Sequence, residues 1–166
     1  MSYKVIDNFL PNNIFESICD IILSGDFPWH FEPKITLKKE KFDTENFKFY
    51  MVHLLMGKNF EKSPFYDKIV PHFYDKLNIN GVRRIKINFY PYQGKFDEHL
   101  PHRDYEYEHK GALFALNTCN GYTKLHDGTK IDSVENRLLI FDASTKHCST
   151  NTTSSERRLN INFNYF

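Results

Sequence analysis

The stretch that decides the fold is residues 158–165, with the sequence RLNINFNY, close to the end of the chain. Its apolar residues are Leu159, Ile161, Phe163 and Tyr165, and Arg158, Asn160, Asn162 and Asn164 lie between them. Because successive side chains of a β-strand point to opposite faces, this strand has one apolar and one polar face. Two explanations fit the pattern. Either one face of a sheet is in water, or helices cover the apolar face and the polar face lines the cavity of a small barrel.

The same alternation occurs upstream, in residues 82–90, where Ile85, Ile87 and Phe89 alternate with Arg84, Lys86, Asn88 and Tyr90. From Gly81 onward the chain consists of short strand-like stretches separated by turn residues, which is typical of antiparallel sandwiches and barrels. We expect strands at 82–90, 100–104, 112–116, 122–125, 137–142 and 158–165, with a further short one at 146–148.

The first half of the chain has a different pattern. Residues 3–7 predict a short strand, and Ile14, Phe15, Ile18, Ile21 and Ile22 recur at the spacing of an amphipathic helix that ends near Ser24. A strand at 49–56 and a second helix at 64–77 follow. Residues 34–46 are rich in Lys and Glu, which favours a solvated surface loop, with an active-site lid as the alternative.

Length, charge and composition indicate the general class of protein. The chain has 166 residues, which predicts a single domain spanning 1–166. A net charge of +1 gives no indication of a polyphosphate partner, and 16 Phe with 10 Tyr favour a sheet-rich core. Three widely separated cysteines form no disulfide or zinc pattern. Without a secretion signal or a membrane-spanning apolar run, the protein is expected to be soluble and cytoplasmic, with no membrane partner.

The most informative polar residues are those of the tripeptide His102-Arg103-Asp104. On an extended strand, residues i and i+2 point the same way, so the imidazole and the carboxylate are adjacent potential metal ligands. A third imidazole would complete a two-histidine, one-carboxylate face, which suits Fe(II) and leaves three octahedral positions open. His147 is the natural candidate because it follows the apolar run 138–141 at the end of a strand.

Other assignments remain open at this level. An H-x-D tripeptide alone is weak evidence, because chance matches are frequent and a surface histidine is usually solvated. His99 is the main rival ligand, whereas His109 and His126 fall in expected loops and are structural or substrate-facing. Zinc is a further possible occupant, although it prefers tetrahedral nitrogen and sulfur ligand sets.

The second half of the chain resembles a known family. The run NRLLIF at 136–141, then His147, then RRLNINF at 157–163 is similar to the closing segment of the 2-oxoglutarate/Fe(II) oxygenases. Upstream, NFYP at 88–91, Gly94 and the H-x-D tripeptide match that family's order. Residues 116–117 with GYTKL at 121–125 resemble the hairpin between its two metal-binding strands, and VIDNFLP at 5–11 resembles the start of prolyl-4-hydroxylase-like members.

The resemblance implies a mainly β (α+β) fold, in which a double-stranded β-helix, or jelly roll, is covered by two N-terminal helices. It also implies that His102, Asp104 and His147 hold Fe(II), and that an Arg or Lys about ten residues after the distal histidine holds the far carboxylate of 2-oxoglutarate. Arg157 and Arg158 both fit that spacing. Alternation favours Arg158, because it shares the polar face. Positions that match further 2-oxoglutarate contacts are Tyr90 and Asn88, with Asn160 and Asn162 as weaker candidates.

One departure affects the expected co-substrate site. Many prolyl-hydroxylase-like enzymes carry a tyrosine in the strand that corresponds to 112–117, where this chain has Phe114 and Ala115. We therefore expect Arg158 and Tyr90 to contribute more to holding the far carboxylate.

The resemblance implies a dioxygenase that uses O2 and releases succinate and CO2, with ascorbate as an accessory reductant, and that hydroxylates a protein side chain or a small molecule. Two alternatives stay open. A nucleic-acid oxidative demethylase would fit N-x-Y, but such relatives carry a second arginine where this chain has Asn164. A catalytically silent jelly-roll binding module is the other. Arg103, Tyr105 and Tyr107 are candidate substrate contacts, and the sequence names neither the substrate nor the oligomeric state.

Overall fold

The structure is a computed structural model that describes residues 3–33 and 48–166. The helices are α1 (Asn12–Leu23), α2 (Tyr66–Ile69) and α3 (Pro71–Leu77). The strands are β1 (Lys4–Ile6), β2 (His30–Glu32), β3 (Tyr50–Met56), β4 (Val82–Pro91), β5 (Lys110–Ala115), β6 (Tyr122–Leu125), β7 (Lys130–Asp132), β8 (Arg137–Asp142), β9 (His147–Ser149) and β10 (Arg157–Tyr165). The protein is thus mainly β with few helices, as the sequence predicts.

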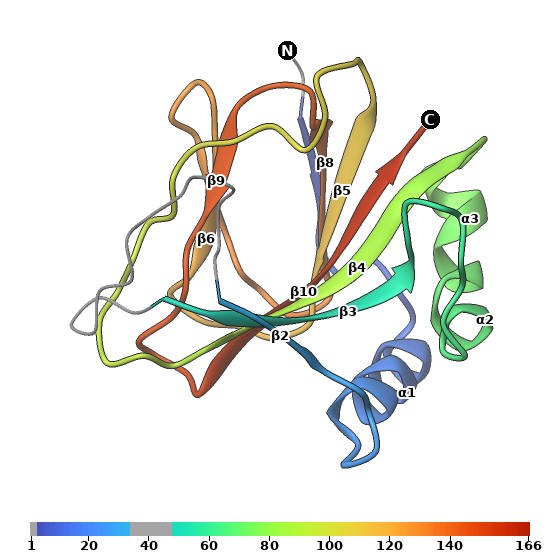
Figure 1. The fold of residues 1–166 in the computed structure, drawn as a ribbon, viewed down its shortest axis with the longest axis horizontal. Coiled ribbons are helices and arrows are strands. Elements are labelled where there is room, and N and C mark those ends of the chain that lie inside the picture. Colours follow the sequence, from blue (N-terminus) through green and yellow to red (C-terminus); the bar gives the residue numbers. More distant parts are fainter. Residues whose placement is uncertain (1–2, 34–47) are drawn as a thin grey trace.

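The strands form two antiparallel sheets (Figure 1). The larger has seven strands in the order β1-β8-β5-β10-β4-β3-β2, and the smaller has three in the order β7-β6-β9. The position of β10 between β5 and β4 fixes the register of the large sheet, since Asn160 lies opposite both Asn88 and Ala115.

Both faces of β10 are buried. On the apolar face, Ile161 and Phe163 are 0% exposed, and on the polar face Arg158 and Asn160 are 1% exposed. A sheet with one face in water would expose the second pair. The alternation therefore reflects an apolar core on one side of the large sheet and an enclosed polar interior on the other.

The three helices pack against the apolar face of the large sheet (Figure 1). Ile18 and Ile22 of α1 and Phe73 of α3 join one hydrophobic cluster with the apolar residues of β4 and β10. The helix expected at 64–77 occurs as two short helices, α2 and α3, separated at Val70. Pro71 accounts for the division, because proline has no backbone N–H to donate and is favoured at the first position of a helix.

The strand expected at 100–104 is not formed as a regular strand. Only isolated bridges pair this segment with the region of β9, joining Glu98 to Thr150 and His102 to His147. Between the two bridges, the segment that contains residues 98–102 advances by four residues, whereas its partner, residues 147–150, advances by three. The first segment therefore has one extra residue in the ladder. Pro101 lies in that interval and cannot donate to a ladder. The structure also adds β2 and β7, which the sequence pattern did not predict.

The segment at 34–46, expected to be a surface loop or a lid, lies outside the described residues. Within the described part of the chain, no helix has both the length and the apolar character needed to cross a membrane.

The core predicts a clear stability difference between two truncations. Phe114 is fully buried and contacts the rings of Phe9, Phe15 and Phe73, so Phe114→Ala should lower the free energy of unfolding by about 3–5 kcal/mol. Leu23→Ala, at an exposed position at the end of α1, is the matched control and should change it by less than about 1 kcal/mol. Urea denaturation measures both, and equal losses would contradict the assignment of the core.

Candidate metal centre and co-substrate pocket

Three side chains from two separate segments converge on one point. The ligand atoms of His102, Asp104 and His147 all lie within 4.8 Å of one another. The backbone brings them together, because the N–H of His102 donates to the carbonyl of His147, and the N–H of His147 donates back, each over 2.9 Å. The H-x-D segment is therefore joined to the start of β9 at the position of both histidines.

The rings are oriented by backbone carbonyls. His147 Nδ1 lies 3.0 Å from the carbonyl oxygen of Thr145, and His102 Nδ1 lies 3.4 Å from that of Leu100. A carbonyl accepts a hydrogen bond, so these contacts favour a proton on Nδ1 and a free lone pair on Nε2.

The donor set fits a divalent metal ion. Asp104 Oδ2 is buried, has no hydrogen-bond partner, and lies 3.9 Å from His147 Nε2. An unsatisfied buried carboxylate oxygen is unfavourable unless a cation approaches it. Two imidazole nitrogens and one carboxylate oxygen are the ligands of non-haem Fe(II) facial sites.

The other oxygen of Asp104 is held by Arg84. The Arg84 Nη2 atom lies 2.9 Å from Asp104 Oδ1, in an ion pair whose side chains are 15% and 6% exposed. Burial raises the pKa of Asp104, but the positive charges of Arg84 and the neighbouring cationic groups outweigh it and hold the pKa at about 2. Arg84 thus keeps the carboxylate ionised and fixes one of its oxygens.

A small polar pocket, about 40 Å³ in volume, extends from these ligands into the interior. Seven of the eight site residues expected from the sequence line it, namely Asn88, Tyr90, His102, Asp104, His147, Asn160 and Asn162. Asn88 donates to Asn160 across β4 and β10 over 2.8 Å. In the strand that lacks this tyrosine, β5 presents Leu113 to the pocket, while Phe114 points into the hydrophobic core.

Arg158, the eighth expected residue, lies behind this lining. Its guanidinium donates to the carbonyl of Thr150 over 2.9 Å and to Thr123 Oγ1 over 3.1 Å, while Nε is buried without a partner. Its guanidinium carbon is 5.9 Å from the ring centre of Tyr90, and Thr123 and Tyr90 are themselves part of the pocket wall. Arg157 points the other way and pairs with Glu156 near the surface, as the alternation predicts.

The rival ligand His99 does not join the metal group. It is 4% exposed, its Nδ1 lies 3.0 Å from Ser149 Oγ, and its ring packs 5.2 Å from that of Tyr90. His109 is also structural, since both ring nitrogens are hydrogen-bonded, to the Tyr107 carbonyl and to Asn164. His126 is exposed.

Sequence reasoning assigned no role to Arg84 or Lys86, although both belong to this site. Arg84 holds Asp104, and Lys86 lines the pocket beside Asn88. The sequence did contain a signal for Arg84 and Lys86, because positions 84, 86, 88 and 90 share one face of an alternating strand. Of the candidate substrate contacts, Arg103 forms an exposed ion pair with Glu106, whereas the Tyr105 hydroxyl is buried.

His99 predicts a specific pH dependence of stability. Burial, with the charge of Arg158 adding to it, lowers the pKa of His99 to about 3. The unfolded chain, where the pKa is about 6.5, therefore binds more protons between those values, and stability falls as pH drops from about 6.5 toward 3. The maximum slope from one such group is about 1.4 kcal/mol per pH unit. His99→Gln should flatten the stability profile between pH 6 and 4, as measured by urea denaturation. Parallel profiles for the two proteins would contradict the prediction.

Gly121 predicts a steric effect on Arg158. A Cβ at Gly121 would lie 2.5 Å from Arg158 Cδ and 2.7 Å from the backbone oxygen of Asn151. Gly121→Ala should therefore displace Arg158 and destabilise the protein by about 1–3 kcal/mol. Gly25→Ala is the matched control, because a Cβ there would meet nothing within 4 Å. Thermal unfolding compares the two, and an unchanged midpoint for Gly121→Ala would show that the site tolerates the methyl group.

No protein-family model and no curated protein sequence matches the chain. Solved structures do. A prolyl hydroxylase from Trichoplax adhaerens, in complex with a hypoxia inducible factor peptide fragment, matches with TM-score 0.69 and 17% identity over 99% of this chain and 83% of its own. The viral collagen prolyl hydroxylase of Paramecium bursaria Chlorella virus-1 matches with TM-score 0.63 and 15% identity, over 99% and 95%. A 2OG-Fe(II) oxygenase-family oxidoreductase from Burkholderia pseudomallei gives 0.68 and 12%, over 98% and 84%. The chain therefore has the fold of the prolyl-hydroxylase-like 2-oxoglutarate/Fe(II) oxygenases.

Proposed function

We propose that this protein is an Fe(II)/2-oxoglutarate-dependent dioxygenase that hydroxylates a protein side chain or a small molecule and releases succinate and CO2. The observation that carries the proposal is the convergence of His102, Asp104 and His147, with a buried, unpaired carboxylate oxygen among them. The fold shared with prolyl hydroxylases supports it. We further propose that residues 1–166 act as one domain with a jelly-roll core covered by the N-terminal helices.

In this proposal His102, Asp104 and His147 hold the iron. Iron with 2-oxoglutarate and O2 supplies an oxidant strong enough to hydroxylate a C–H bond. The protein itself orients the side chains that would bind the iron. The carbonyls of Thr145 and Leu100 keep each Nε2 free to bind, and Arg84 fixes the orientation of the Asp104 carboxylate.

Arg158 is proposed to hold the far carboxylate of 2-oxoglutarate, with the Tyr90 hydroxyl beside it and Asn88, Asn160 and Asn162 along the pocket. The support is its burial, its unpartnered Nε and its contact with two residues of the pocket wall. A guanidinium fork matches a carboxylate, and its hydrogen bonds are strong where water is excluded. Ascorbate, if required, would act only as a reductant of the iron.

The structural neighbours favour one class of substrate. The Trichoplax structure contains a peptide, which favours a protein or peptide substrate for this chain. Asn164 does not support the nucleic-acid alternative, because its side chain is buried and hydrogen-bonded to His109. The cysteines at 19, 119 and 148 are free thiols, in agreement with action in the reducing cytoplasm.

The proposal is tested by succinate formation from 2-oxoglutarate, Fe(II) and O2, followed for variants on opposite faces of β10. Arg158→Met should raise the KM for 2-oxoglutarate at least about 30-fold, because losing one partner of a buried charge pair costs about 2 kcal/mol or more. Arg157→Met removes the same charge one residue away and should change the KM by less than about twofold. Thermal unfolding shows whether each variant is folded.

His102→Ala should abolish succinate formation, whereas His126→Ala, at an exposed position, should retain it. A wild-type protein that binds Fe(II) and 2-oxoglutarate, seen as a weak visible absorption band without oxygen, but forms no succinate would favour the silent binding module. Equal KM values for Arg158→Met and Arg157→Met would exclude Arg158 from the co-substrate site.

A further inference from the structure

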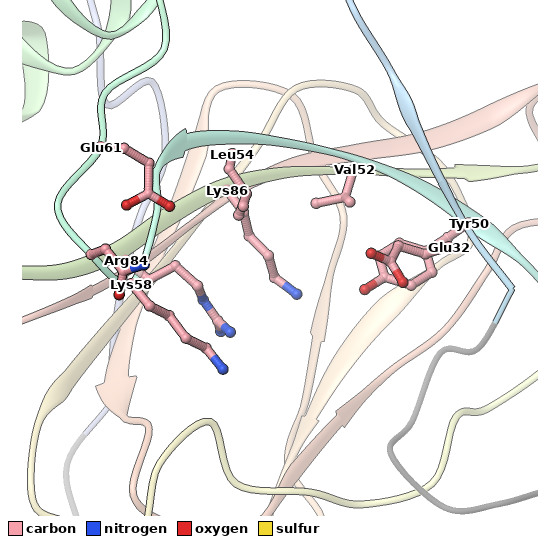
Figure 2. Close-up of a pocket in the computed structure, with 9 residues that line it drawn as sticks. Glu32, Tyr50, Val52, Leu54, Lys58, Glu61, Arg84 and Lys86 are labelled. Carbon is pink, nitrogen blue, oxygen red and sulfur yellow. The ribbon is translucent and has the colours of Figure 1, made fainter.

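A second, larger cavity adjoins the metal centre. It has a volume of about 390 Å³, and its polar lining consists mainly of Glu32, Tyr50, Lys58, Glu61, Arg84 and Lys86 (Figure 2). Lys86 lines both this cavity and the inner pocket, and Arg84 reaches from the cavity wall to Asp104. A molecule in this cavity would therefore lie next to the metal ligands.

Three cationic side chains line the cavity. The nitrogen ends of Lys58, Arg84 and Lys86 point into the same space (Figure 2). Arg84 uses Nη2 to hold Asp104, but its Nε is buried and makes no hydrogen bond. Within residues 3–33 and 48–166, no hydrogen bond or ion pair to the Lys86 ammonium is found, and its nearest aromatic neighbour is the ring of Tyr50, 5.7 Å away.

A partly buried ammonium without a partner is unfavourable. Burial, together with the charge of Arg84, lowers the pKa of Lys86 to about 8. An anion bound between Lys86 and Arg84 Nε would satisfy both groups. A carboxylate can offer one oxygen to each of these two donors.

Arg158 and Lys86 lie toward opposite ends of the polar face. Arg158 lies opposite Tyr90 in the β10–β4 register, whereas Lys86 lies opposite Asn162. These positions are four residues apart on each strand, a separation of roughly 13 Å along the strand. The metal ligands lie toward the Lys86 end, because Arg84 holds Asp104 there. A co-substrate that extends from the metal to Arg158 would leave Lys86 on the other side of the metal.

We propose, on the basis of the function proposed above, that the prime substrate carries a carboxylate that binds Lys86 and Arg84 Nε at the inner end of this cavity. The carboxylate comes either from a small carboxylic acid or from an acidic peptide. In both cases it anchors the substrate beside His102, Asp104 and His147, with the carbon to be oxidised facing the metal.

Binding is measured by NMR on protein labelled with ¹³Cε-lysine and loaded with 2-oxoglutarate and Zn(II), which supports no turnover. The probes are matched pairs that differ only in the carboxylate. N-acetylproline is compared with its amide, and the peptide acetyl-Ala-Glu-Ala-amide with the same peptide containing Gln. Lys86→Met identifies the Lys86 signal, and Lys68 on α2 is the control lysine.

At least one carboxylate probe should shift the Lys86 signal to saturation, with an affinity at least about tenfold above that of its amide partner. The signal of Lys68 should not move. In Lys86→Met, binding of that probe, followed by its own NMR signals, should weaken at least about tenfold, whereas Lys68→Met should bind as the wild type does. The acid probe and the peptide probe distinguish the two sources of the carboxylate.

The proposal is overturned if neither carboxylate moves the Lys86 signal more than its amide partner does, or if Lys86→Met binds the probe as the wild type does. Failure of the dioxygenase proposal is recognised separately, as the absence of succinate from wild-type protein with Fe(II), 2-oxoglutarate and O2. That assay needs no prime substrate, so the two results are independent.

Discussion

Two reciprocal backbone hydrogen bonds between His102 and His147 are the interaction on which the site depends. They join an irregular segment to the start of β9 and place both imidazoles beside Asp104. The bridge occurs where the regular ladder has been interrupted near Pro101. A continuous ladder would have added backbone hydrogen bonds in this segment. The proposed iron site thus lies where the sheet is least regular.

The regular parts of the structure could be read from the sequence, because alternation is a local property. The pattern of β10 placed Arg158 inward and Arg157 outward, and the family resemblance placed Asn88 and Tyr90 in the pocket, on the polar face of β4. The parts that could not be read depend on contacts between distant segments. The ion pair between Arg84 and Asp104 requires the register of the folded sheet, and the broken strand at 100–104 requires its partner near β9.

Burying polar groups in the interior costs free energy unless each group forms a hydrogen bond. Nearly every buried polar group there has a partner, such as the Asn88–Asn160 pair or His109 with Asn164. Among the described residues, eight buried side-chain atoms have no partner: Asp104 Oδ2, Arg84 Nε, Arg158 Nε, Asn88 Oδ1, His99 Nε2, His53 Nε2, Asp97 Oδ2 and the Tyr105 hydroxyl. Buried donors and acceptors are rarely left unpaired without a reason. Four of the eight, on Asp104, Arg84, Arg158 and Asn88, belong to side chains that are proposed to contact the metal, the co-substrate or the substrate.

The close approach of Gly121 to Arg158 has a consequence for how such a pocket evolves. The stem of the arginine and a side chain at 121 would occupy the same volume, so the two positions are coupled across strands that are far apart in sequence. In this protein the arginine fits because a glycine faces its stem. If the arginine at 158 is conserved for function, the glycine at 121 should be conserved with it, although Gly121 contacts no ligand. The two positions are expected to covary among homologues.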